Sequence, residues 1–80
     1  MNIAQYRSIG EWYKAVKTEG YSVPVTACHA LSQIMKKLNL SFPEAYQLLV
    51  AKEKLILVNK TYILDLSFTK LFDQQSSRDF

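Results

Sequence analysis

The stretch Ile34-Met35-Lys36-Lys37-Leu38-Asn39-Leu40-Ser41 joins two predicted helices through a turn of only three residues. Asn39 tolerates the left-handed backbone conformation that ends a helix. The apolar side chain of Leu40 is expected to pack in the turn between the two helices, and Ser41 is a good N-cap for the second of them. Two helices joined this tightly cross at a steep angle. The stretch therefore predicts a helix-turn-helix.

The helix after this turn begins with Ser41-Phe42-Pro43-Glu44, which has the form of a capping box. We expect this helix to run to about Lys54. Its inward face should be apolar and carry Ala45, Leu48 and Leu49. The small side chain of Ala45 should let the two helices approach each other.

A first helix is predicted near the start of the chain. Ser8 and Glu11 can form a capping box for a helix over Ile9–Thr18, and Gly20 can adopt the left-handed conformation that stops it. Apolar residues at helical spacing give this segment one buried stripe.

The connection between the first and second helices is expected to be extended. Pro24 cannot donate a backbone hydrogen bond, so residues 21–25 form either a short edge strand or a plain link. Thr26 is then expected to cap the second helix, which ends at Asn39.

Two short apolar segments, Leu55–Val58 and Thr61–Leu66, predict a β-hairpin closed by Asn59-Lys60. A two-residue turn sets Val58 opposite Thr61, and this register places apolar side chains on both faces of the ribbon. We therefore expect both faces to be at least partly covered.

The order helix, extended link, helix, short turn, helix and hairpin resembles the winged helix-turn-helix family of DNA-binding domains, over Ile9–Leu66. The resemblance implies an α+β fold, mainly helical, with three helices and a two- to three-stranded wing sheet. We expect residues 1–68 to form this domain. Residues 69–80 would be a short C-terminal segment that serves in oligomerisation or frays.

The resemblance implies a small DNA-binding regulator, which reads the major groove with the helix over about residues 42–54 and uses the 55–66 hairpin as its wing. On that helix, Phe42 could touch a thymine methyl group, Tyr46 could reach a phosphate and Gln47 could read an adenine edge. The helix has no arginine, so the usual bidentate reader of guanine is missing there.

The positive charge lies at the edges of the motif. The net charge is +3, which permits nucleic-acid binding without requiring it. The candidate phosphate contacts are lysines at the ends of the second and third helices and at the hairpin turn, namely Lys36, Lys37, Lys52, Lys54 and Lys60. Lysines at helix C-termini also favour the helix dipole, which is an alternative reason for their presence.

The alternative function is a small protein-interaction module or inhibitor on the same scaffold, of the type that phages and plasmids encode. Exposed aromatic residues anchor protein interfaces, and Phe42 and Tyr46 lie one turn apart on the third helix. A chain with so small a core can also form a homodimer, for which Leu71-Phe72 in the C-terminal segment is a candidate element.

Catalysis is not expected. The single cysteine and the single histidine, Cys28 and His29, are adjacent, so on a helix they diverge by about 100° and cannot act as nucleophile and base. No histidine and cysteine spacing predicts a metal site, and no glycine-rich loop predicts a cofactor. One cysteine, no signal peptide and no long apolar segment favour a cytoplasmic protein without a membrane partner.

Overall fold

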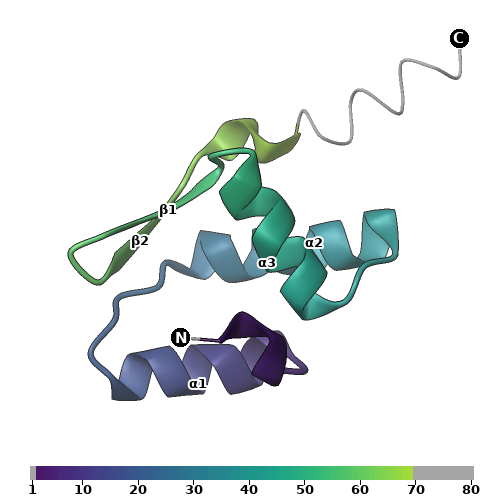
Figure 1. The fold of residues 1–80 in the computed structure, drawn as a ribbon. Helices are drawn as coiled ribbons and strands as arrows, with labels where there is room; N and C mark the ends of the chain where they lie inside the picture. Colours follow the sequence, from purple (N-terminus) through teal and green to yellow (C-terminus); the bar gives the residue numbers. More distant parts are fainter. Residues whose placement is uncertain (1, 70–80) are drawn as a thin grey trace, which may run out of the picture.

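Three helices and one antiparallel hairpin form the fold, as seen in a computed structural model that describes residues 2–69 (Figure 1). The elements follow in the order η1 (Ile3–Gln5), α1 (Ile9–Thr18), α2 (Val25–Leu38), α3 (Phe42–Ala51), β1 (Leu55–Val58), β2 (Thr61–Leu64) and η2 (Leu66–Thr69). This layout is winged-helix-like, and the expected α+β class is confirmed. The C-terminal element expected over 69–80 lies, from residue 70 on, outside the described residues.

Local side-chain caps fix the starts of α1 and α3. The Ser8 hydroxyl accepts a hydrogen bond from the Glu11 amide at 3.2 Å, and α1 has the predicted bounds. At α3 the Glu44 carboxylate accepts from both the amide and the hydroxyl of Ser41, at 3.0 and 2.9 Å. Both capping positions are therefore where the sequence places them.

The start of α2 differs from the prediction. The helix begins at Val25, its N-cap is Pro24, and Thr26 lies inside the first turn. Pro24 has φ −68° and ψ 147°, an extended conformation that proline adopts readily and from which the chain enters the helix directly. A side-chain cap at Thr26 is therefore not used.

The turn between α2 and α3 is the predicted one. Asn39 has φ 56° and ψ 52°, which is the left-handed conformation. The amide of Leu40 donates back to the carbonyl of Met35 at 3.0 Å and closes the end of α2. Figure 1 shows α3 crossing over α2 after this turn.

The end of α3 comes earlier than expected, at Ala51 instead of Lys54. Glu53 adopts a left-handed φ of 60°, and the Lys54 amide donates to the carbonyl of Leu49 at 2.8 Å. Residues 51–54 contain no glycine or asparagine, the residues that usually end a helix in the left-handed conformation, so the sequence does not predict this end.

The second strand also ends earlier, at Leu64 instead of Leu66. The Asp65 carboxylate accepts from the Ser67 amide at 2.9 Å and starts η2, while the Asp65 amide donates to the carbonyl of Lys54 at 2.7 Å. Asp65 thus turns the chain away from the sheet.

An aromatic cluster around Trp12 joins the elements. The Trp12 ring centroid lies 5.5 Å from that of Phe42, 5.8 Å from that of Tyr46 and 5.2 Å from that of Tyr62. These rings connect α1 to α3 and to β2. Phe68 of η2 also belongs to the core. The other core residues are aliphatic and come mainly from α2 and the other faces of the same elements: Val16, Val23, Ala27, Ala30, Leu31, Ile34, Ala45, Leu49 and Leu55.

The hairpin has the predicted register, with Val58 opposite Thr61. Residue 22 extends the sheet by one isolated parallel bridge, because the Ser22 amide donates to the Lys60 carbonyl and the Ser22 carbonyl accepts from the Tyr62 amide. The extended link between α1 and α2 therefore lies along the outer edge of β2.

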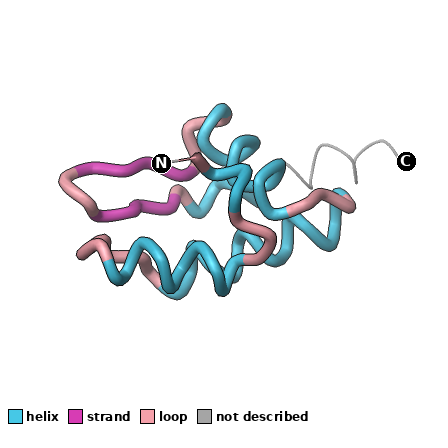
Figure 2. The backbone as a smooth tube through the Cα atoms, turned by 60° about the horizontal axis from the view of Figure 1, so that its bottom comes forward, coloured by secondary structure: helices cyan, strands magenta, loops and turns pink. Residues whose placement is uncertain are grey.

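The expectation that both hairpin faces are at least partly covered holds for the inner face and is wrong for the outer one. Leu55 and Tyr62 on the inner face are 2% exposed and pack on the core, whereas Ile56, Val58 and Ile63 on the outer face are 45–49% exposed. α3 contacts β1 and α2 contacts β2, and in Figure 2 the hairpin and α1 extend toward the same side of the molecule.

Replacing Phe42, which is 0% exposed, by alanine should lower the free energy of unfolding by about 3–5 kcal/mol, because it leaves a cavity beside Trp12. Such a loss approaches the whole stability of a small domain, so Phe42→Leu, with a smaller expected loss of about 1–2 kcal/mol, provides a measurable intermediate. Urea denaturation followed by Trp12 fluorescence gives these values. The surface variant Val50→Ala is the control, and equal losses in Phe42→Ala and Val50→Ala would contradict the buried position of Phe42.

Candidate functional site

The outward face of α3 carries Glu44, Gln47, Val50 and Ala51. Phe42 is absent from this face because its ring packs in the core, so the expectation that it touches a thymine methyl group is wrong. Of the three side chains expected to meet DNA from this helix, only Gln47 is exposed.

Tyr46 is half-buried, and its hydroxyl is engaged within the molecule. The hydroxyl oxygens of Tyr46 and Tyr62 lie 3.0 Å apart in a hydrogen bond, and both rings contact the Trp12 ring edge-on. Burial raises the pKa of the Tyr46 phenol, and the hydrogen bond to Tyr62 raises it further. The Tyr46 hydroxyl is therefore used in a hydrogen bond within the molecule. The expected phosphate contact by Tyr46 has no support in this geometry.

Glu44 places a fixed negative charge at the start of the candidate reading helix. The hydrogen bond from the Ser41 amide lowers the pKa of the Glu44 carboxyl, and the Ser41 hydroxyl lowers it further. The carboxylate is exposed and ionised at neutral pH. It would repel a phosphate backbone that approached the N-terminus of α3.

The candidate lysines do not gather on one surface. Lys36 and Lys37 lie in the last turn of α2, beside the α2–α3 turn, and Lys60 lies at the hairpin tip. Figures 1 and 2 place this turn and the hairpin tip at opposite ends of the molecule. Lys52 is the C-cap of α3, on a third part of the structure.

Lys54 and Lys60 have side-chain contacts within the molecule. The Lys54 ammonium donates to the Ser67 hydroxyl at 2.8 Å, which ties the start of β1 to η2. The Lys60 ammonium lies 3.4 Å from the Glu19 carbonyl oxygen and 5.7 Å from the centroid of the Tyr21 ring. The contacts of Lys60 hold the hairpin tip against the end of α1.

An apolar surface, here called the hairpin patch, consists of five side chains that are each 44–49% exposed: Val50, Ile56, Leu57, Val58 and Ile63. Val50, Ile56 and Leu57 line one pocket of about 530 Å³ beside β1. Ile63 is the cross-strand partner of Ile56, and Val58 follows two residues later on the same face. Leu57, the cross-strand partner of Tyr62, lies on the other face, so the patch includes side chains from both faces of β1 and meets Val50 at the pocket.

The sequence contains a signal for this patch. In a hairpin with one solvent-exposed face, apolar and polar residues alternate along each strand. Residues 55–58 and 62–64 are instead all apolar. That pattern shows that both faces are apolar, but it does not show whether either is covered, which depends on the position of the helices.

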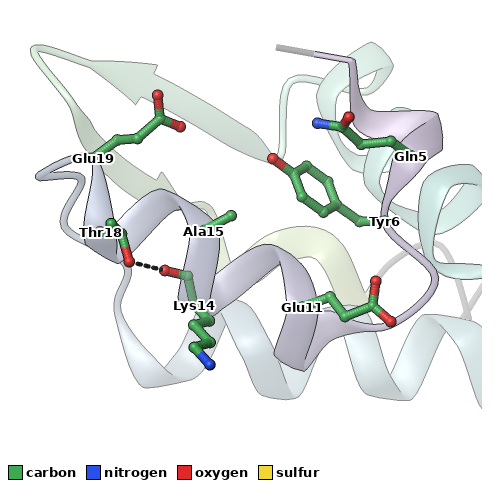
Figure 3. A pocket seen from close by; sticks show the side chains of 7 residues that line it. All are labelled: Gln5, Tyr6, Glu11, Lys14, Ala15, Thr18 and Glu19. Atoms are coloured by element: carbon green, nitrogen blue, oxygen red, sulfur yellow. Dashed lines mark hydrogen bonds between the residues drawn. The ribbon is translucent and has the colours of Figure 1, made fainter.

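A second pocket, of about 690 Å³, lies between η1 and α1 (Figure 3). Its charged lining residues are Glu11, Lys14 and Glu19, and the side chains of Lys14 and Glu19 extend in opposite directions in Figure 3. Because these groups do not converge on one point, the pocket does not form a binding site for a charged ligand.

Cys28 is half-buried, and burial raises the pKa of its thiol, so the thiol stays protonated at neutral pH. Within residues 2–69, no three side chains of the metal-ligating types lie close enough together to hold an ion. None of the helices in this part of the chain has the length and apolar character needed to cross a membrane.

Comparison with known proteins found no matching family model, no matching curated protein and no matching solved structure. The resemblance to winged helices consequently rests on the order and arrangement of the elements alone.

The tyrosine pair should make stability sensitive to alkaline pH. The pKa of Tyr46 is raised in the folded protein, so the unfolded chain loses this proton first, near pH 10, and stability that is complete below pH 10 falls as the pH rises further. One proton accounts for a loss of at most about 1.4 kcal/mol per pH unit. Melting temperatures from pH 8 to 11.5 should therefore fall less steeply for Tyr46→Phe than for the wild type. Tyr13→Phe, outside the pair, is the control. Parallel curves for Tyr46→Phe and wild type would contradict this role.

Proposed function

We propose that this domain is a protein-interaction module that binds its partner through the hairpin patch. The observation that carries the proposal is the exposure of five large aliphatic side chains on adjoining elements, with no charged residue in either strand. Single exposed apolar residues are common on monomeric proteins, but a contiguous group of this kind marks an interaction surface. The surface differs from the one expected on α3, because Phe42 and Tyr46 belong to the core cluster.

The charges on α3 also favour a protein partner. The exposed face of α3 carries Glu44 as an ionised carboxylate and, up to Ala51, no lysine or arginine. A helix that enters the major groove lies between two phosphate backbones, so an uncompensated carboxylate at its N-terminus opposes binding. The same face has no such conflict with a protein.

DNA binding remains a second candidate because of a specific observation. The α2–α3 turn has the left-handed Asn39 of a helix-turn-helix, and Gln47 is exposed on the helix that would read bases. Gln47 has the donor and acceptor needed for an adenine edge, and Lys60 at the hairpin tip carries the charge expected of a wing.

A photo-cross-linking residue at position 58 should form a covalent adduct with a protein in the producing cells, because Val58 is exposed on the outer hairpin face beside the turn. The same residue at position 33, on the exposed face of α2, should form none. Adding Ile56→Lys should abolish the adduct, because it places a charge in the patch on the same face as Val58. Its effect on the melting temperature should be small, since Ile56 is half exposed. Gln33→Lys is the matched control. Absence of an adduct at position 58, or an adduct that survives Ile56→Lys, would overturn the proposal.

The DNA candidate is tested by a fluorescence titration with random duplex DNA at two salt concentrations. If it is correct, the affinity is micromolar or tighter and falls steeply with salt, by a slope of about 0.9 per phosphate contact. Gln47→Ala should then change sequence preference, and Lys60→Ala should weaken binding to all sequences alike. The protein-interaction proposal predicts no binding even at low salt.

A further inference from the structure

We propose that the partner at the hairpin patch is a second copy of this chain, which pairs β1 with β1 antiparallel about a two-fold axis at Leu57. This inference rests on the proposed function and makes its partner specific. It is carried by the free backbone edge of β1, an observation independent of the exposed side chains.

The direction of the Leu57 backbone groups follows from the hydrogen bonds of β2. Leu57 is directly opposite Tyr62, and the Tyr62 amide donates outward to the Ser22 carbonyl at 2.8 Å, away from β1. In an antiparallel ladder, two opposite residues either both point their backbone groups at each other or both point them outward. The N–H and C=O of Leu57 therefore point away from β2.

The two edges of the hairpin are not equivalent. The outer edge of β2 is occupied by Ser22, which forms one hydrogen bond with Lys60 and one with Tyr62. Along the outer edge of β1, the described part of the chain places no strand, and Leu57 there is 45% exposed. Of the two edges that residues 2–69 form, only the β1 edge can accept another strand without displacing part of the described fold.

Nothing in the sequence of β1 protects this edge. Natural edge strands are commonly blocked by a lysine, a proline or a bulge, whereas Leu55-Ile56-Leu57-Val58 has none of these and pairs with β2 in unbroken register. Two copies of this chain each carry a net charge of +3, which disfavours their general association. The uncharged β1 edge is a place where they can approach closely.

A two-fold axis at Leu57 makes the contact self-complementary. Leu57 exchanges two backbone hydrogen bonds with Leu57 of the partner subunit, and Ile56 packs beside the partner subunit's Val58. The two hairpins then form one four-stranded sheet. Adjacent aliphatic side chains of this kind stabilise paired strands.

Leu57→Pro tests the pairing selectively. The Leu57 N–H is outside the intramolecular ladder, so proline removes the donor needed by a second copy and leaves the hairpin hydrogen bonds in place. In sedimentation equilibrium on the purified full chain, from about 10 to 500 μM, the wild type should approach twice the monomer mass, and Leu57→Pro should stay monomeric. Leu57→Thr keeps the N–H and should dimerise at least tenfold more tightly than Leu57→Pro. Circular dichroism establishes that each variant is folded.

The outcomes separate this inference from the proposed function. A wild type that remains monomeric throughout, or a folded Leu57→Pro that dimerises like the wild type, overturns the inference. If Leu57→Pro does not fold, Leu57→Lys replaces it, and dimerisation of that variant at wild-type strength overturns the inference equally. A monomeric wild type that still forms the position 58 adduct with a different protein leaves the proposed function intact. Loss of both dimer and adduct overturns both.

Discussion

The packing of Trp12 against rings from α3 and β2 is the contact on which the rest of the structure depends. Trp12 is completely buried, and its neighbours Phe42, Tyr46 and Tyr62 come from elements far apart in the sequence. A domain of this size has few other large side chains for its core. The indole N–H of Trp12 has no hydrogen-bond partner within residues 2–69, so the cluster is stabilised by ring packing, which outweighs the cost of that unpaired donor.

This cluster also determines which surfaces remain for function. By taking Phe42 and Tyr46 into the core, it leaves α3 with an outward face of one carboxylate, one amide and small or aliphatic side chains. By holding Tyr62, it orients the hairpin so that the opposite face, with Ile56 and Ile63, points to solvent. The same contacts that complete the core thus weaken α3 as a reader of DNA and expose an apolar surface elsewhere.

The sequence predicts those parts of the fold that depend on neighbouring residues. Capping at Ser8 and Ser41, the left-handed Asn39 and the register at Val58 and Thr61 are all local, and all are confirmed. Burial depends on contacts between distant segments, so the exposed position assigned to Phe42 and the cover expected over the outer hairpin face were wrong. Of the candidate site, Gln47 could be placed on an exposed helix face in advance, whereas the dispersal of the lysines follows only from the arrangement of α2 and the hairpin.

The aromatic cluster buries Phe42 and leaves the outer hairpin face exposed to solvent. The most direct test is the attenuation of side-chain NMR signals by a soluble paramagnetic probe, with the Ile63 methyl groups compared against the Phe42 ring. Ile63 lies on β2, away from the β1 edge, so the comparison holds for a monomer and for a dimer paired through β1. We expect strong attenuation at Ile63 and almost none at Phe42. Attenuation at Phe42 as strong as that at Ile63 would contradict it.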